Sequence, residues 1–456
     1  MEKVKKPSVA GRFYTNNRPE LARQLSEFER LCKKDRDVSS RLVIAPHAGY
    51  IYSGQLMSES IGFLQKDVKN IFIFAPSHHA AFIGLALSHY DRWQTPLGEL
   101  ELNKAINEDL ESKFFCHYLD DAFEQEHAVE VEVPFIQHYF PEGVRIIPIL
   151  AGRAVPQKIM DIIDHFYDDP QNAFVISSDL SHFLNSVQAR QTDEGTACMI
   201  EGKEISRLHP DQACGALGIV GAVLFARKRN FSFIRAGMYN SGDITGDRSR
   251  VVGYGSWFLY EQSKEHFLKE YYSDLIRDSV RKAISFGLKE HSKMKRSDLE
   301  KIPPVLEQQG ACFITLEIEG RLRGCIGSII ARRPLIDDIL DHSWNAAFSD
   351  PRFDPLSQKE FEKISISISL LSPPIPLLFK SEEEMKDQIR PFRDGLIISD
   401  GYRQAVYLPS VWEQLPDKDQ FLRNLKIKAG MSPDHFSKSF EAHVFTTEYI
   451  TGKEKE

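Results

Sequence analysis

The sequence predicts an α/β fold class: an N-terminal layered α/β domain with a mostly parallel sheet, followed by a C-terminal α+β domain. Three observations lead to this prediction. Short apolar runs alternate with helical patterns over the first part of the chain, which is typical of a layered α/β domain. A long amphipathic helix then follows a polar stretch. Beyond this helix, hairpin signals and strands with period-2 alternation dominate.

Four apolar runs in the first part are predicted to be strands. They are rich in Val, Ile and Phe and are bounded by polar, Gly or Pro residues, as expected of strands buried on both faces. Helices are expected over 18–34 and 154–169, and extended segments over 231–243 and 248–262 are expected to close the same sheet. The four predicted strands are 41–47, 70–78, 144–152 and 172–182.

The second part begins with the amphipathic helix, which is predicted over 265–291. We place the domain boundary around 262–266, which gives an α/β domain of residues 1–262 and an α+β domain of residues 266–452. The other predicted elements are a hairpin over 311–329, a strand over 363–377, a second hairpin over 394–409 and a helical pair over 409–431.

Length and composition fit a globular chain. The 456 residues suggest two or three domains. The net charge is −8 and no basic block occurs, so nucleic acid is not an expected partner. No apolar stretch approaches the roughly 20 residues that span a bilayer, and the N-terminus has no apolar leader, so we expect a cytoplasmic protein without a membrane partner. The six cysteines form no Cys-x-x-Cys pair and are expected to be reduced thiols.

Metal-binding and proton-transfer residues follow three of the four predicted strands. Because the carboxyl ends of parallel strands meet at one edge of a sheet, we expect these side chains to converge there. Imidazole is the commonest protein ligand for transition metals, and two imidazoles with one anionic ligand and open positions form a usual catalytic metal site. The candidates are His47, His78 with its neighbour His79, His127, Asp179 with His182, and Cys214.

Asp179 and His182 are three residues apart, so both can face one cavity and suit proton transfer. Cys214 begins a helix of small residues over 214–226, and a helix N-terminus lowers the pKa of a thiol. Simpler interpretations remain open: a loop histidine, a small buried cysteine, and a helix N-cap around Asp179. Metal-free chemistry, with Cys214 as nucleophile and His47 as base, is a further alternative.

Six motifs follow one another in the first part: VAGRFY (9–14), IAPHAGYIYSG (44–54), APSHH (75–79), EHAVEVEVPF (126–135), SSDLSHF (177–183) and ACGALGI (213–219). On these motifs, residues 1–262 resemble the Memo family, relatives of the class III extradiol ring-cleaving dioxygenases. The resemblance implies a dioxygenase-like domain with a transition metal ion, copper or iron first and zinc as an alternative. It implies the metal ligands His47, His78 and Cys214, with His127, Asp179 and His182 lining the same pocket.

The second part carries four further motifs: LRGCIGSI (322–329), AAFSDPRFDPL (346–356), ISISLLSPP (366–374) and LPSVW (408–412). On these motifs, residues 266–452 resemble the AMMECR family, whose fold is α+β. The candidate functional residues implied here are Arg323, Cys325 and the loop over 350–354. Cys325 can equally be packed beside glycines on its strand, and the loop can equally be a rigid turn held by two prolines.

Together the two resemblances are similar to two parts of the AmmeMemoRadiSam system, whose third part resembles a radical S-adenosylmethionine enzyme on a separate chain. No three-cysteine cluster motif occurs in this sequence. We therefore expect a metal-binding protein with a redox or oxygenase-like site that acts on an unknown small molecule beside a radical S-adenosylmethionine partner. In this site, His182 or His127 is expected to move protons, with Asp179 orienting. The alternative is a non-catalytic scaffold that binds a ligand or a protein and keeps a relict metal pocket.

Overall fold

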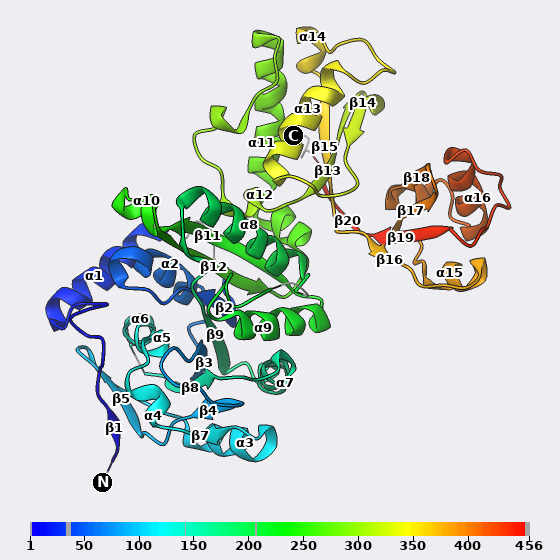
Figure 1. Cartoon of the computed structure of the whole chain (residues 1–456). Coiled ribbons are helices and arrows are strands. Elements are labelled where there is room, and N and C mark those ends of the chain that lie inside the picture. Colours follow the sequence, from blue (N-terminus) through cyan, green and yellow to red (C-terminus); the bar gives the residue numbers. More distant parts are fainter. Residues whose placement is uncertain (1, 33–37, 142, 206–207, 452–456) are drawn as a thin grey trace. The chain divides into compact units, whose positions relative to one another are not determined.

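A computed structural model describes residues 2–32, 38–141, 143–205 and 208–451 (Figure 1). The chain divides into unit 1, Met1–Gln262, and unit 2, Ser263–Glu456. Each unit has its own sheets and its own buried apolar core. None of the helices in the described part of the chain is long and apolar enough to cross a membrane.

A mixed sheet of nine described strands forms the centre of unit 1. Four central strands lie in the order β2 (Leu42–Ala45), β9 (Asn172–Ser177), β3 (Asn70–Pro76) and β8 (Arg145–Ala151), and all neighbours among them are parallel. The α/β class is confirmed, and the sheet is mixed, since β12 and β4 join the central strands in antiparallel orientation while the edge strand β7 pairs with β4 in parallel. The outer strands are β4 (Leu85–Leu87), β7 (His117–Tyr118), β10 (His182–Leu184), β11 (Ser232–Asn240) and β12 (Val251–Tyr260).

Helices cover both faces of the central strands. Every residue of β2 is buried, and successive residues of a strand point to opposite faces, so neither face is open to water. Two helices, α1 and α2, lie on one side of the sheet, and α7 and α9 lie on the other (Figure 1). Their bounds are α1 (Arg18–Leu31), α2 (Tyr50–Gly62), α7 (Pro156–Tyr167) and α9 (Ala216–Arg229).

Glycine lets α9 approach its neighbours closely. A Cβ added at Gly221 would lie 2.7 Å from the side chain of Ile159 in α7, which is too close for packing without a shift. The rest of unit 1 consists of α3 (Lys104–Phe114), α4 (Asp121–Glu124), α5 (His127–Glu130), α6 (Val133–Tyr139), α8 (Ser186–Gly202), α10 (Ser241–Thr245) and a small sheet of β1 (Val4–Lys5), β5 (Arg92–Thr95) and β6 (Gly98–Glu101).

Two antiparallel four-stranded sheets form unit 2, so the α+β prediction is confirmed. The first sheet, in the order β14-β13-β15-β20, packs against α11 and α13. The second, in the order β16-β19-β17-β18, shares a core with α15 and α16, in which the rings of Trp412 and Phe421 stack 3.6 Å apart. The elements are α11 (Lys264–Glu290), η1 (Arg296–Asp298), α12 (Pro304–Glu307), β13 (Ala311–Ile318), β14 (Arg321–Gly327), α13 (Leu335–Phe348), α14 (Gln358–Phe361), β15 (Ser365–Leu371), β16 (Ile375–Pro376), α15 (Glu382–Gln388), β17 (Gly395–Asp400), β18 (Arg403–Tyr407), η2 (Pro409–Glu413), α16 (Lys418–Lys428), β19 (Glu441–Phe445) and β20 (Thr447–Thr451).

Asp338 in α13 is a buried carboxylate that ties several segments of unit 2 together. It accepts hydrogen bonds from the backbone N–H of Cys312 at 3.0 Å, the hydroxyl of Ser328 at 2.7 Å and Nε of Arg333 at 2.9 Å. Burial by itself would raise the pKa of this carboxyl group. Interactions with His342, Ser328 and Arg333 outweigh burial and lower the pKa to about 2.

Replacing Asp338 by Asn should therefore destabilise unit 2 at pH 7, by about 1–3 kcal/mol, because buried donors lose their charged acceptor. Since the folded pKa lies below the usual value, this contribution is present above about pH 4 and is lost as the pH falls through about 2. Urea denaturation of both proteins between pH 7 and pH 2 measures the difference. Asp337→Asn, on the same helix, is the control, and equal stability of the Asp338 and Asp337 variants at pH 7 would refute this role.

Candidate metal centre

His47 lies directly beyond β2 and is held from β9 and the loop that follows it. Its backbone N–H donates to Oδ1 of Asp179 at 2.8 Å, and its Nδ1 lies 2.8 Å from Oγ of Ser177, the last residue of β9. Because β2 and β9 are adjacent and parallel, His47 and Ser177 reach the same edge of the sheet. Ser177 thus engages Nδ1, whereas Nε2 of this buried imidazole lies 3.2 Å from Sγ of Cys214.

His78 lies just beyond β3 and is held by Glu126. Its backbone N–H donates to Oε2 of Glu126 at 2.6 Å, and its Nδ1 lies 2.9 Å from Oε1. Glu126 is fully buried and also caps α5 by accepting the N–H of Ala128 at 3.0 Å. A carboxylate bonded to Nδ1–H orients Nε2 of a histidine toward a metal and raises its basicity.

His127 is the first residue of α5, and the N-terminal segment packs against it. The ring centroid of Phe13 lies 4.7 Å from that of His127. Glu130, one turn further along α5, accepts the N–H of Val9 and the hydroxyl of Tyr14, each at 2.9 Å. These contacts fasten the VAGRFY motif to the helix that carries His127.

The three imidazoles meet at the carboxyl edge of the central strands. One ring nitrogen from each of His47, His78 and His127 lies within 4.8 Å of the others. Their ring centroids are separated by 5.3 Å, 5.5 Å and 4.7 Å. Metal–nitrogen bonds of about 2.0–2.1 Å place ligand nitrogens roughly 3–4 Å apart, so a small side-chain adjustment would bring all three onto one ion.

The electrostatics of the cluster also fit a metal ion. Burial, followed by the neighbouring imidazoles, lowers the pKa of His47 well below its usual value, and burial lowers the pKa of His127 to about 4. Burial acts in the same direction on His78, but the hydrogen bond and charge of Glu126 outweigh it and raise the pKa. His47 and His127 are therefore neutral at pH 7, which is the form of imidazole that binds metals.

Cys214 lies beside the cluster, just before α9. Its Sγ is 3.2 Å from Nε2 of His47 and accepts the backbone N–H of Asp179 at 3.3 Å. The expected lowering of its pKa by the helix N-terminus is wrong, because burial and the charge of Asp179 raise the pKa of this thiol. The three clustered nitrogens include His127, not Sγ of Cys214. A ligand role for Cys214 therefore stays a prediction.

Asp179 and His182 both lie after β9. Asp179 is buried, and burial raises its pKa to about 7. Nδ1 of His182 lies 2.8 Å from the carbonyl oxygen of Leu180. Because a carbonyl only accepts, Nδ1 carries the proton and Nε2 keeps a free lone pair. Burial lowers the pKa of His182, so this imidazole is neutral at pH 7.

The other residues selected from the sequence lie outside the cluster. The ring centroid of His79 is 6.3 Å from that of His127, and His79 is exposed. Arg323 and Cys325 lie on β14 of unit 2, where Nε of Arg323 pairs with Oε1 of Glu360 at 2.8 Å. This ion pair gives Arg323 a structural partner within unit 2.

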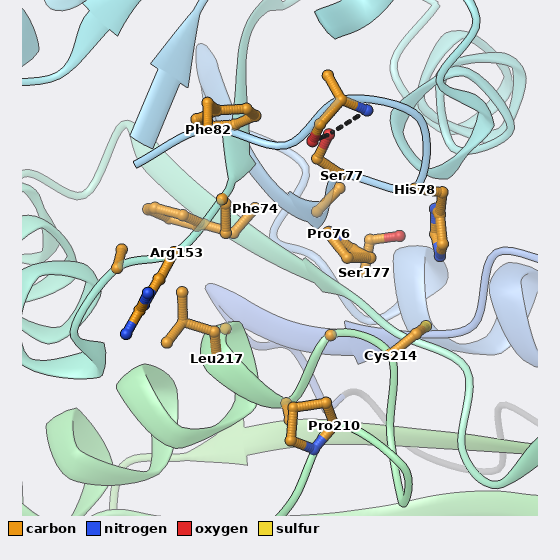
Figure 2. A pocket seen from close by; sticks show the side chains of 18 of the residues that line it. Phe74, Pro76, Ser77, His78, Phe82, Arg153, Ser177, Pro210, Cys214 and Leu217 are labelled. Atoms are coloured by element: carbon orange, nitrogen blue, oxygen red, sulfur yellow. Dashed lines mark hydrogen bonds between the residues drawn. The ribbon is translucent and has the colours of Figure 1, made fainter. Parts of the chain in front are cut away.

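A cavity of about 590 Å³ opens beside the cluster (Figure 2). In this view His78 and Cys214 lie on one side of the cavity, and Phe82 and Arg153 lie on the other. Most of the lining residues are apolar, and Arg153 adds a cationic group. A small molecule in this cavity would therefore reach His78 and Cys214.

The groups that hold the histidines were not predicted from the sequence, namely Glu126, Glu130 and Ser177. Glu126 and Glu130 lie on either side of His127 in the sequence, but a third glutamate, Glu132, lies in the same seven-residue stretch. Their spacing does not show which one reaches His78, which is 48 positions away from Glu126. Ser177 ends a predicted strand and was not distinguishable from an ordinary strand residue.

The fold and the cluster together define a two-domain α/β protein with a candidate histidine metal site in its first unit. The chain belongs to the Memo family, because the family model described as Memo-like protein matches residues 5–258. The model described as AMMECR1 matches residues 278–450. Both resemblances expected from the sequence motifs are thereby confirmed.

Relatives of this chain are matched over almost their whole length. A MEMO1 family protein of Thermoplasma acidophilum is 31% identical over 270 residues, which cover 55% of this chain and 97% of that protein. One of Methanosarcina barkeri is 30% identical over 269 residues, which cover 56% of this chain and 98% of that protein. The crystal structure of an uncharacterised protein from Pyrococcus horikoshii matches with 29% identity and a TM-score of 0.37, covering 39% of this chain and 89% of that one.

Replacing His47, His78 or His127 by Ala should remove one ligand each and weaken Zn²⁺ binding by more than about 100-fold, the upper range for loss of a supporting group. Isothermal titration of the metal-free protein with Zn²⁺ measures the affinity. His79→Ala is the matched control and should bind like the wild type. Affinities in the three variants that equal that of His79→Ala would rule out this centre.

Proposed function

We propose that unit 1 is a metal-dependent catalytic domain with a redox or oxygenase-like site. His47, His78 and His127 would hold one transition metal ion, copper or iron first and zinc as the alternative. The observation that carries this proposal is the convergence of three imidazoles, two of which have Nδ1 engaged by an oxygen of Ser177 or Glu126. Three protein ligands leave positions open, which is the plan of catalytic rather than structural metal sites.

When bound, the metal would supply Lewis-acid or redox chemistry. The protein's own groups would orient the site and move protons. His182 can accept a proton at Nε2, because its Nδ1–H donates to the carbonyl of Leu180. Asp179 fixes the backbone of His47 through the hydrogen bond of 2.8 Å. Cys214, with Sγ 3.2 Å from Nε2 of His47, is the candidate for an additional ligand.

The substrate that we propose is a small organic molecule bound in the cavity beside the cluster. The volume of about 590 Å³ falls within the range of about 300–1,000 Å³ that is usual for ligand pockets. For the whole chain we propose a radical S-adenosylmethionine protein as partner. The presence of a Memo-like and an AMMECR1 region in one chain supports this partner, through its similarity to the AmmeMemoRadiSam system.

Nitric oxide tests whether the site has the open position that catalysis needs. With Fe²⁺ added, nitric oxide should bind to the wild type and give the electron paramagnetic resonance signal of a ferrous nitrosyl. His47→Ala should abolish the signal together with the metal. His182→Ala should keep it, because His182 is assigned to proton transfer and not to ligation. Fe²⁺-loaded wild type without a nitrosyl signal would favour the non-catalytic scaffold.

A further inference from the structure

Glu132 is a buried acid that lies behind His47, on the other side of Ser177. Its side chain is fully buried, and Oε1 lies 3.3 Å from Oγ of Ser177. Its Oε2 has no hydrogen-bond partner within the described ranges, and no ion pair of Glu132 occurs there. Burial raises the pKa of Glu132 well above its usual value. A buried carboxylate without a cation is strongly unfavourable, so the neutral acid is the expected form.

Ser177 has three polar neighbours but only one proton. Its Oγ lies 2.8 Å from the carbonyl oxygen of Ala128, 2.8 Å from Nδ1 of His47 and 3.3 Å from Oε1 of Glu132. The carbonyl oxygen of Ala128 can only accept, so the Ser177 hydroxyl donates its proton to this oxygen. Nδ1 and Oε1 must then each donate to one lone pair of Oγ. This assignment satisfies all three contacts, whereas any other leaves at least one of them without a donated proton.

The contact on the other side of the His47 ring is compatible with the same assignment. Sγ of Cys214 lies 3.2 Å from Nε2 of His47 and already accepts the N–H of Asp179 at 3.3 Å. A thiol has a single proton to donate, and Nε2 can accept it only when the ring proton is on Nδ1. The thiol can also donate to the carbonyl oxygen of Asp179 at 3.7 Å, so the contacts of Ser177 decide the tautomer of His47.

We propose that Glu132 is a positioning residue for the metal centre: as a carboxylic acid it donates to Ser177, and Ser177 holds His47 with its proton on Nδ1 and its Nε2 lone pair toward the ion. This inference rests on the proposed metal site and adds the group that sets the tautomer of one ligand. Glu126 has the corresponding role for His78, as a carboxylate that accepts Nδ1–H directly at 2.9 Å. Two ligands are thus oriented by acids in opposite protonation states.

Two spectroscopic measurements on the metal-free full chain test the protonation states. The infrared difference spectrum of wild type and Glu132→Gln at pH 7 should contain the C=O band of a protonated carboxyl group that only the wild type has. Long-range ¹H–¹⁵N spectra should show His47 protonated on Nδ1 in the wild type and in Glu132→Gln, whose amide still donates to Ser177. In Ser177→Ala this preference should be lost. An ionised Glu132, or a wild-type His47 protonated on Nε2, would overturn the inference.

Zn²⁺ affinity tests the consequence for the metal centre. Glu132→Gln should bind within about twofold of the wild type, whereas Glu132→Ala and Ser177→Ala should each lose about 10–100-fold. Because both residues act through one chain of hydrogen bonds, the double variant should lose no more than Ser177→Ala alone. Wild-type affinity in Glu132→Ala, or additive losses in the double variant, would overturn the inference.

If Glu132→Ala does not fold, the comparison of Glu132→Gln with Ser177→Ala decides. Near-wild-type affinity in Glu132→Gln and a loss in Ser177→Ala support the inference, and equal affinities overturn it. A wild type that binds no Zn²⁺ refutes the proposed function instead. The infrared and tautomer results do not need a bound metal, so they still test the role of Glu132 in that case.

Discussion

The parallel alignment of β2, β9 and β3 is the constraint on which the candidate metal centre depends. Parallel neighbours end at the same edge of a sheet, so residues that are far apart in the sequence arrive side by side. His47 follows β2, Ser177 ends β9, and His78 follows β3. The start of α9 closes this edge, and Gly215 is needed there because a Cβ would come within 2.5 Å of the carbonyl oxygen of Ser177.

The buried acid Glu130 explains how a motif that contains no metal ligand contributes to the metal centre. Glu130 forms an ion pair with Lys5 at 3.3 Å, and both side chains are almost fully buried. Such a pair costs desolvation energy, which the additional hydrogen bonds from Ser8, Val9 and Tyr14 offset in part. The motif thereby places Phe13 against His127. The N-terminal segment and the buried charge of Glu130 therefore hold the third imidazole, that of His127.

Much of the fold could be predicted from the sequence, and part of the site could not. The run over 70–78 alternates with helical patterns and is found as β3, because burial on both faces leaves a clear apolar signal. Helix α2 was not predicted, because it contains glycines and serines of low helix propensity. Most of its residues are buried, so its packing in the fold stabilises it. His127 was predicted to line the pocket, but its place beside His47 depends on contacts between segments that are far apart in the sequence. The raised pKa of Cys214 depends on burial, which its helix position does not reveal.

X-ray absorption spectroscopy at the metal edge tests the three-histidine centre most directly, because it reports the atoms bound to the ion. With one equivalent of copper or zinc, we expect a nitrogen shell at about 2.0–2.1 Å and multiple scattering from three imidazoles. In His127→Ala the scattering should correspond to two imidazoles. Scattering from fewer than three imidazoles in the wild type, or a spectrum that His127→Ala leaves unchanged, would contradict a centre built on His47, His78 and His127.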